Sequence, residues 1–430
     1  MQTNNLLPPA KSKIGIWGFG VVGKSVLSFL TNCKEKEYQI SLLEQRELTS
    51  LEQALIQGHN VHCIDQAFLP QFLELNDFII ASPGIDLEPY KDYQDKWLTE
   101  LDLFSALNTT PVIAVTGSIG KTSIVTLLTG LLNAFGKRAC AIGNIGTPML
   151  DLLADSQNSY DYYVMELSSF QLEHAQYFKP NIAIITNLIA NHLDRHKTLE
   201  NYLLAKKQIL KNQTEEDFAI IPMEFMDAFW PFIGQQKVIW VGENSFDDIT
   251  KMLSDITCTQ NWNLILTVLE LLDLPIDKVP DYVHKIIMPR HRVEFLGTHD
   301  GVKFYNDSKA TVIESTKEAL KRFKTEPVLL FLGGLSKGTD RQPLITWLPE
   351  NIKQVFCFGK EADQLAKWCT ESGIKNSSHK TLESAFESCV KVMNSHDIVL
   401  LSPSGSSYDL FAHYEERGDV FTKLFKKLKK

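Results

Sequence analysis

The sequence predicts a three-domain α/β protein, and three observations support this prediction. Apolar, β-branched runs such as Pro111–Val115 and Asn181–Asn187 have the length of buried parallel strands. Stretches with helical spacing follow most of these runs. Glycine-rich or polar loops stand where the strands end, which is where open α/β sheets bind ligands. We expect a Rossmann-like N-terminal domain, a P-loop ATPase-like central domain and a Rossmann-like C-terminal domain, over residues 1–98, 99–289 and 290–430 respectively.

The composition excludes several classes of protein. The net charge of −9 argues against nonspecific nucleic-acid binding. Seven cysteines are scattered without a CxxC pair, so we expect reduced thiols and a cytoplasmic location. The N-terminal stretch lacks the apolar segment of a signal peptide, and no apolar run reaches the roughly 18 residues of a membrane span. We read the basic end KKLKK as a solvated helix terminus.

The first region has the pattern of a Rossmann βαβ unit. Lys13–Trp17 is a short apolar strand, Gly18–Gly23 reads GFGVVG, and Glu44 ends a second strand about 20 positions further on. This pattern predicts a bound nucleotide-like group and, by itself, suggests NAD and a dehydrogenase. Ser82–Ile85 (SPGI) follows another strand-like run, and it either forms a simple turn or brings backbone close to a ligand.

The central region is organised around Thr116–Ser123, TGSIGKTS. A strand, a glycine-rich loop and a helix form a phosphate cradle, because the helix N-terminus carries unpaired N–H groups and partial positive charge. Lys121 would reach the phosphates and the Thr122 hydroxyl would sit on Mg²⁺. Val115 stands where the full P-loop motif has glycine, so the alternative is an ordinary turn that contains GKT. The predicted nucleotide-binding residues are Gly117, Ser118, Ile119, Gly120, Lys121, Thr122 and Ser123.

Two further stretches of the central region point to a metal. Glu166 ends a strand, where a Mg²⁺ ligand is expected near a P-loop, although it could instead belong to a helix cap. His192, Asp194 and His196 alternate after another strand and predict a compact polar cluster for a metal–phosphate site. Lys206 and its neighbour Lys207 follow on a helix, where two adjacent lysines usually form a solvated face.

The last region carries anion-binding groups in its loops. Asp300-Gly301 predicts a hairpin turn, and later strands end in loops that contain Lys309, Lys337 and Ser404–Ser407. Cations and hydroxyls at helix starts suit a carboxylate or phosphate. ATP together with carboxylates indicates a ligase that makes an amide through an acyl phosphate. A non-enzymatic ATP switch is the alternative, but it leaves Lys309 and Lys337 unexplained.

Essentially the whole chain resembles the Mur ligases. The shared stretches are TGSIGKTS, GNIG, ELSSFQLE and NHLDRH, and SPGI, NDSKAT, GG-x-x-KG, LSP followed by SSYDLF, and EERGDVF are closer to the member that adds D-glutamate. The resemblance implies an ATP-dependent ligase that joins D-glutamate to UDP-N-acetylmuramoyl-L-alanine in peptidoglycan precursor synthesis, acting as a monomer. A related ligase that adds another amino acid, of the folylpolyglutamate type or another Mur ligase, is the alternative.

The resemblance also implies roles for individual residues. The catalytic residues would be Lys121, Glu166, His192 and Lys206. Two Mg²⁺ ions would be held by Thr122, Glu166, His192 and Lys206, the last as a carbamate. UDP and the muramoyl group would be bound by Gly20, Glu44, Arg46, Ser82, Gly84, Asn144 and His192. ATP would also contact Asn261, Arg292 and Asp307. D-glutamate would be bound by Lys309, Thr311, Lys337, Ser407 and Tyr414.

Several positions depart from the family pattern. Ile119 replaces a usual asparagine in the phosphate loop, and Asn191 stands where an acid commonly precedes the histidine. The adenine-site pattern is only partly met, so Asn261 and Asn263 are both candidates for that contact.

Overall fold

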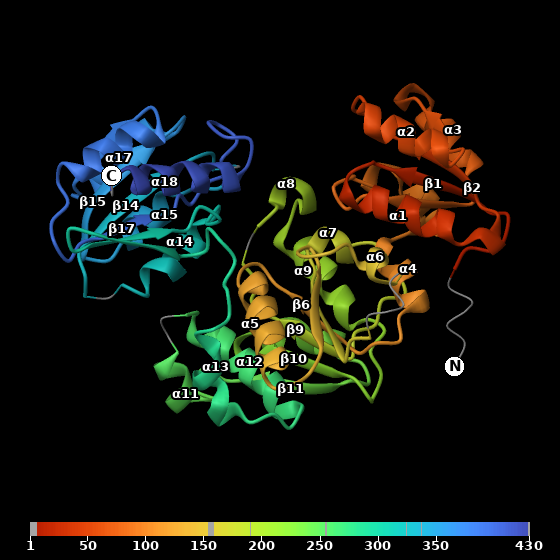
Figure 1. Ribbon diagram of the computed structural model, residues 1–430, viewed down its shortest axis with the longest axis horizontal. Coiled ribbons are helices and arrows are strands. Elements are labelled where there is room, and N and C mark those ends of the chain that lie inside the picture. Colours follow the sequence, from red (N-terminus) through yellow and green to blue (C-terminus); the bar gives the residue numbers. More distant parts are fainter. Residues whose placement is uncertain are drawn as a thin grey trace. The chain divides into compact units, whose positions relative to one another are not determined.

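The computed structural model describes residues 7–153, 159–189, 191–253, 256–323, 325–336 and 338–428, without the side chains of Leu193 and Asp194. The described chain contains three sheets, each formed by its own stretch of sequence (Figure 1). It divides into two compact units, Met1–Thr250 with Thr259–Ile286, and Lys251–Cys258 with Ile287–Lys430. The first two sheets share the first unit, so the predicted boundary at residues 98 and 99 stays a prediction.

The N-terminal sheet is parallel, with the strand order β3-β2-β1-β4-β5. Alternation along β1 buries Ile14 and Ile16 in one core and Trp17 in another, because successive side chains point to opposite faces. Helix α1 covers one face, where Ile56 of α2 joins the same core, and α3 packs on the other face. The elements are β1 (Lys13–Trp17), α1 (Val21–Asn32), η1 (Lys34–Lys36), β2 (Gln39–Leu43), α2 (Ser50–Gly58), β3 (His62–Ile64), η2 (Gln66–Phe68), α3 (Leu69–Leu75), β4 (Phe78–Ala81), η3 (Glu88–Lys96) and β5 (Trp97–Leu98).

The glycines of the first loop have separate tasks. Gly18 adopts φ +90°, a backbone conformation that residues with a Cβ rarely adopt. A Cβ on Gly23 would lie 2.1 Å from the carbonyl oxygen of Gly18, so only glycine lets α1 approach the strand end. A Cβ on Gly20 would meet no atom within 4 Å. Gly20 therefore leaves open space beside the loop, as a close-lying ligand would need.

The central sheet is also parallel, with the order β11-β10-β9-β6-β8-β7. Strand β6 is fully buried between two neighbours, as the apolar run beginning at Pro111 predicts. The elements are α4 (Glu100–Leu107), β6 (Val112–Thr116), α5 (Lys121–Ala134), β7 (Ala139–Gly143), α6 (Met149–Leu153), β8 (Tyr162–Glu166), α7 (Ser169–Leu172), β9 (Ile182–Ile185), α8 (Leu193–His196), α9 (Leu199–Lys207), η4 (Gln208–Leu210), β10 (Phe218–Pro222), η5 (Met223–Phe225), α10 (Met226–Phe229), η6 (Trp230–Phe232), β11 (Lys237–Val241), α11 (Asp247–Met252), α12 (Thr259–Leu271), η7 (Ile276–Lys278) and α13 (Val279–Val283).

The third sheet has the order β12-β13-β17-β14-β15-β16 and is parallel except for the β12–β13 hairpin. Asp300 and Gly301 both have positive φ, which confirms the predicted two-residue turn. The elements are β12 (Glu294–His299), β13 (Val302–Asn306), α14 (Ile313–Leu320), β14 (Val328–Gly333), α15 (Gln342–Trp347), β15 (Ile352–Phe358), α16 (Ala362–Glu371), β16 (Asn376–His379), α17 (Leu382–Val390), β17 (Ile398–Leu401) and α18 (Tyr414–Leu428). Across the described chain, we find no helix with the length and apolar character that crossing a bilayer requires.

We predict that Gly23→Ala destabilises the protein by about 1–3 kcal/mol, because its Cβ would overlap the Gly18 carbonyl. Gly20→Ala is the matched control, since its Cβ enters open space, and its stability should stay within about 0.5 kcal/mol of the wild type. Scanning calorimetry at one scan rate compares the two variants. Equal melting temperatures would contradict this account of the loop.

Candidate active site

The loop between β6 and α5 is bent by two glycines. Gly117 adopts φ +145° and Gly120 adopts φ +87°. An added Cβ would lie 1.9 Å from Thr186 Oγ1 at Gly117 and 2.6 Å from Asn261 Oδ1 at Gly120. Neither position therefore accepts a side chain, either conformationally or sterically. The loop turns directly into the N-terminus of α5, where backbone N–H groups have no intrahelical acceptor.

Two residues at the end of β9 hold this loop in place. Asn187 Oδ1 accepts hydrogen bonds from the backbone N–H groups of Ser118 (3.1 Å) and Ile119 (3.0 Å). The carbonyl of Ile119 accepts from Asn187 Nδ2 at 3.0 Å and from Thr186 Oγ1 at 2.6 Å. Ile119 is thus held by its backbone, so the structure does not require the asparagine that is usual there. Sequence reasoning placed Asn187 at a strand end but gave it no role.

Two lysine amines meet at the carbonyl of Gly117. Lys121 Nζ donates to it at 2.8 Å and also to the carbonyl of Ser118, and Lys206 Nζ donates to it at 2.7 Å. Lys206 is 1% exposed. Burial, and then the charge of Lys121, lower the pKa of Lys206 well below its usual value. This favours a neutral amine, which is the nucleophilic form of lysine.

The solvated face that two adjacent lysines suggest is therefore wrong for both residues. Lys207 is also buried, and its ammonium group lies 2.9 Å from the centroid of the Phe232 ring. The two lysines thus occupy different surroundings, since only Lys206 contacts the phosphate loop in the described contacts.

A short polar chain links the first turn of α5 to the ends of β7 and β8. Thr122 Oγ1 donates to Glu166 Oε2 at 2.6 Å, and Asn144 Nδ2 donates to Glu166 Oε1 at 2.9 Å. Glu166 is 3% exposed. The helix cap that was the alternative explanation for Glu166 is provided instead by Ser168, which forms a capping box with Gln171. Glu166 therefore does not cap α7, and its carboxylate contacts Thr122 in the first turn of α5.

A cleft of about 480 Å³ connects these groups to the N-terminal sheet. It is lined by Val21 and Val22 from the start of α1, and by Pro83 from the SPGI loop. Five predicted site residues also line it, namely Ser118, Lys121, Asn144, His192 and Lys206. The cleft therefore runs from the glycine-rich loop region of the first sheet to the phosphate loop of the second.

The two described side chains of the predicted cluster of His192, Asp194 and His196 contact one aromatic ring, that of Phe170. His192 lines the cleft and packs edge-on against Phe170. His196 is buried behind the cleft lining, where it stacks on the same Phe170 ring and its Nε2 pairs with Ser169 Oγ at 2.9 Å. The side chain of Asp194 lies outside the described residues. No group of three or more His, Cys, Asp or Glu residues suited to a metal ion occurs in the part of the chain that the structure describes.

Of the two candidate asparagines on α12, Asn261 lies beside the phosphate loop. Its side chain packs against Gly120 of the phosphate loop. Asn263 points elsewhere, because its Nδ2 donates to the carbonyls of Gly242 and Glu243. Asn261 therefore lies beside the predicted nucleotide site, and its contact with adenine remains a prediction.

Both carboxylate oxygens of Glu44, which follows β2, accept hydrogen bonds from backbone N–H groups. Glu44 Oε2 accepts from the N–H of Phe19 at 2.5 Å, and Oε1 accepts from those of Gln45 and Arg46. Burial raises the pKa of Glu44, but these backbone hydrogen bonds and the charge of Arg46 outweigh it, so the pKa is lowered. In a dinucleotide-binding site this carboxylate would bind ribose hydroxyls. Arg46 in turn pairs with Glu52 and donates to the Phe19 carbonyl, so both residues brace the loop around Gly20.

Two buried arginines organise the strand-end loops of the second unit. Arg417 donates to Ser308 Oγ, to the Ser308 carbonyl and to the Gly405 carbonyl, and thus joins the NDSKAT loop to the serine-rich loop. Arg341 donates to the carbonyls of Gly333 and Gly334 and pairs with Glu361 at 2.6 Å. Sequence reasoning assigned no role to either arginine, although EERGDVF contains Arg417.

The predicted glutamate-binding residues lie on these loops. Lys309 Nζ is 3.7 Å from the centroid of the Tyr414 ring, and Ser407 is buried. Thr311 is half-buried just before α14, and Lys337 lies outside the described residues. The roles of these residues in binding glutamate remain predictions.

The two predicted ATP contacts of the second unit differ in exposure. Arg292 is half-buried. Asp307 is buried, accepts from the Val293 N–H and from Ser402 Oγ, and burial raises its pKa to about 7. Asp307 thus ties together the ends of β13 and β17, and a contact with ATP would come in addition to that task.

Comparison with known proteins identifies the family. Residues 115–270 match the Mur ligase middle domain, and residues 291–405 match the Mur ligase glutamate ligase domain. A UDP-N-acetylmuramoylalanine–D-glutamate ligase from Geobacillus sp. (strain WCH70) is 32% identical over 420 residues, which cover 90% of this chain and 90% of that protein. The chain belongs to the Mur ligase family. Mur ligases are ATP-dependent ligases, so the ligase class and the use of ATP are confirmed.

Two further comparisons agree with this Mur ligase assignment. The protein of the same name from Streptococcus suis (strain 98HAH33) is 33% identical over 351 residues, covering 77% of this chain and 78% of that protein. The crystal structure of MurF ligase from Thermotoga maritima in complex with ADP has a TM-score of 0.59 at 15% identity, covering 99% of this chain and 97% of that chain. This likeness confirms the predicted three-domain α/β fold.

We predict that Asn187→Leu lowers kcat/KM for ATP by about 10²-fold, because it removes three hydrogen bonds to backbone groups of the phosphate loop, including the described partner of the Ile119 N–H, and releases the loop geometry. Asn263→Leu is the matched control, since it removes an amide that bonds only to residues 242 and 243 in the described contacts. Steady-state kinetics with ATP as the varied substrate tests both variants. An unchanged kcat/KM in Asn187→Leu would refute the assigned role.

Proposed function

We propose that this Mur ligase adds D-glutamate to UDP-N-acetylmuramoyl-L-alanine with ATP, in peptidoglycan precursor synthesis. The observation that carries the proposal is the cleft that joins the Pro83 loop and the start of α1 to Lys121 and Lys206. A substrate with a nucleotide at one end and a reacting carboxylate at the other needs a site of this kind. The relatives with this name cover most of the chain at about the same identity.

The N-terminal sheet supports binding of the UDP end. Gly20 lies in open space at the start of α1, where backbone N–H groups attract a diphosphate. Ser82 and Gly84 lie on the neighbouring strand-end loop, and Gly84, like Gly20, has nothing within 4 Å of an added Cβ. Glu44 keeps the loop in shape through its bonds to Phe19 and Arg46, so its contribution to UDP binding is to position the loop.

The phosphate loop would bind ATP next to the L-alanyl carboxylate. N–H groups of residues 120–123 and the amine of Lys121 face the phosphates and spread the charge that develops during in-line attack by the carboxylate. Lys121 already bonds to loop carbonyls, so it is held close to the position that it would occupy. His192, on the cleft wall, would orient the carboxylate as it attacks the γ-phosphate. The acyl phosphate then reacts with the amine of D-glutamate and releases phosphate.

The residues present fit Mg²⁺. Thr122 and Glu166 present oxygen atoms to the same point, with Asn144 fixing the second carboxylate oxygen, and Mg²⁺ prefers oxygen ligands. Mg²⁺ bound there would neutralise phosphate charge. A lysine ammonium would repel the ion, whereas a carbamate on Lys206 supplies oxygen atoms. The lowered pKa of Lys206 favours the amine that reacts with CO₂.

The second unit would bind D-glutamate. Lys309 and Tyr414 lie together, and Ser407 is on the loop that Arg417 joins to the NDSKAT segment. Carboxylate recognition needs cations and hydroxyls in fixed positions, which these contacts provide. Lys337 would pair with a glutamate carboxylate, as the resemblance implies.

We predict that phosphate release from ATP with UDP-N-acetylmuramoyl-L-alanine requires D-glutamate. The measurement compares D-glutamate, L-glutamate, D-aspartate and no amino acid at equal concentrations. Fast release only with D-glutamate supports the proposal. Equal release in all four reactions would overturn the D-glutamate assignment, and release only with another amino acid would assign the chain to a related ligase.

We predict that Lys206→Ala lowers kcat by at least about 10²-fold and abolishes dependence on bicarbonate, because the carbamate is lost. The wild type should lose activity when CO₂ is removed, regain it with bicarbonate and show a carbamate signal in NMR with ¹³C-labelled bicarbonate. Lys207→Ala is the matched control and should keep the bicarbonate dependence and the signal. Full, bicarbonate-insensitive activity of Lys206→Ala would refute the carbamate.

A further inference from the structure

Glu100 is a buried carboxyl group that the local fold does not explain. It lies in the first turn of α4, whose N-terminus is already capped by Thr99 and Asp102. Glu100 is 6% exposed, and its Oε1 has no hydrogen-bond partner among the described residues. Leaving a buried carboxyl oxygen unpaired costs stability, so such a group needs another reason for its presence. Burial, and then the charge of Asp151, raise the pKa of Glu100 to about 7.

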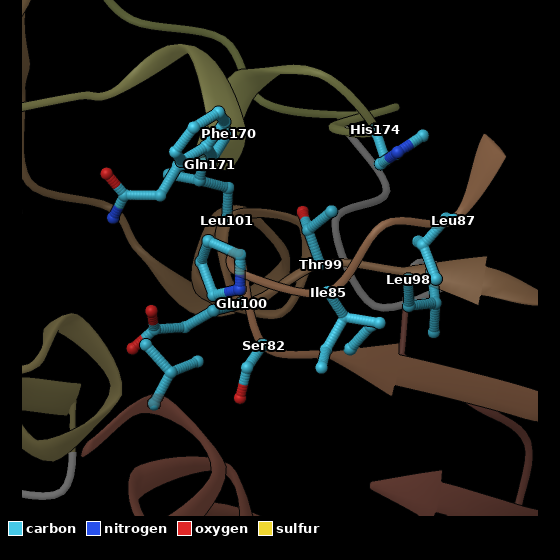
Figure 2. Close-up of a pocket in the computed structure, with 13 residues that line it drawn as sticks. Ser82, Ile85, Leu87, Leu98, Thr99, Glu100, Leu101, Phe170, Gln171 and His174 are labelled. Carbon is cyan, nitrogen blue, oxygen red and sulfur yellow. The ribbon is translucent and has the colours of Figure 1, made fainter. Parts of the chain in front are cut away.

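The position of Glu100 supplies that reason. A small pocket of about 30 Å³ adjoins the cleft, and Val22, Pro83, Glu100, Phe170 and Gln171 line both. Figure 2 shows Glu100 and Ser82 on one side of the small pocket, with Leu87 and Leu98 on the opposite side. Glu100 therefore stands where the small pocket meets the cleft.

The small pocket combines a polar wall with an apolar wall. Leu87, Leu98 and Leu101 line it together with Glu100. A second buried polar atom, His174 Nε2, also has no hydrogen-bond partner in the part of the chain that the structure describes. The volume holds about two water-sized groups. A short group with an N–H, a carbonyl and a methyl matches this lining, and an acetamido group has these three parts.

The cleft places such a group at this point. The pocket opens between the α1 and Pro83 end, which would hold UDP, and the Lys121 and Lys206 end, which would hold the reacting carboxylate. In UDP-N-acetylmuramoyl-L-alanine, the part between the diphosphate and the carboxylate is the sugar with its N-acetyl branch. We propose that the small pocket receives this acetyl group and that Glu100 accepts a hydrogen bond from its amide N–H. The inference rests on the proposed function.

The first experiment uses the wild-type enzyme with three forms of the nucleotide substrate, carrying an N-acetyl, an N-propionyl or a free amino group on the sugar. We expect kcat/KM to fall about tenfold or more for the N-propionyl and free-amino forms, because the pocket has no room for another methylene and the amine lacks the acetyl group. Ile85→Ala enlarges the pocket and should restore use of the N-propionyl form. Equal kcat/KM for the N-acetyl and N-propionyl forms would overturn the inference.

The second experiment tests Glu100 itself. Glu100→Ala should raise KM for the N-acetyl substrate about tenfold while KM for ATP and kcat change little, and Glu100→Gln should recover part of the loss because its carbonyl still accepts. Asp151→Asn is the matched control, since it removes a nearby carboxylate that does not line the pocket. An unchanged KM in Glu100→Ala, or an equal rise for ATP, would overturn the inference. Failure of the proposed function is separately visible as no turnover of the N-acetyl substrate by the wild type.

Discussion

The active site depends on how the backbone from Gly117 to Gly120 is held. Two positive φ angles and the contacts of Thr186 and Asn261 leave the loop a single path, and Asn187 pairs three of its backbone groups. The Gly117 carbonyl then positions Lys121 and Lys206, because both amines donate a hydrogen bond to it. The geometry of the phosphate site is thus set by hydrogen bonds from the neighbouring strand end, before any ligand is considered.

In the second unit, the strand-end loops are held in place by arginine side chains. Among the described residues of its strand-end loops, buried guanidinium groups make the connections. Arg417 reaches Ser308 and Gly405, and Arg341 reaches Gly333 and Gly334. A planar guanidinium with five donors can bind several carbonyls at once, which lysine cannot do in a fixed geometry. Both units therefore present loops whose shape is decided by side chains from elsewhere in the chain.

The cleft of the first unit concentrates ionisable groups that water would otherwise stabilise. Lys206 and Glu100 line it and are each less than 10% exposed. Such burial is unfavourable for a charged group, and it shifts the pKa of Lys206 down and that of Glu100 up. The shifts move each group toward its neutral form. In the proposed chemistry, the neutral amine of Lys206 reacts with CO₂. Glu100 is proposed only to accept a hydrogen bond.

The sequence by itself determined the α/β class, the strand-end positions of the glycine-rich loops and the Mur ligase resemblance, because strand periodicity and glycine motifs are local properties of the chain. Only the tertiary structure decided that Lys206 and Lys207 are buried, that His192 and His196 contact one Phe170 ring, and that Glu44 accepts hydrogen bonds from the backbone. It also showed the roles of Asn187, Arg417 and Glu100. Asn187 acts on a loop 69 residues away and Arg417 on one 109 residues away. Contacts over such separations depend on how strands are ordered in a sheet, which no local pattern in the sequence encodes.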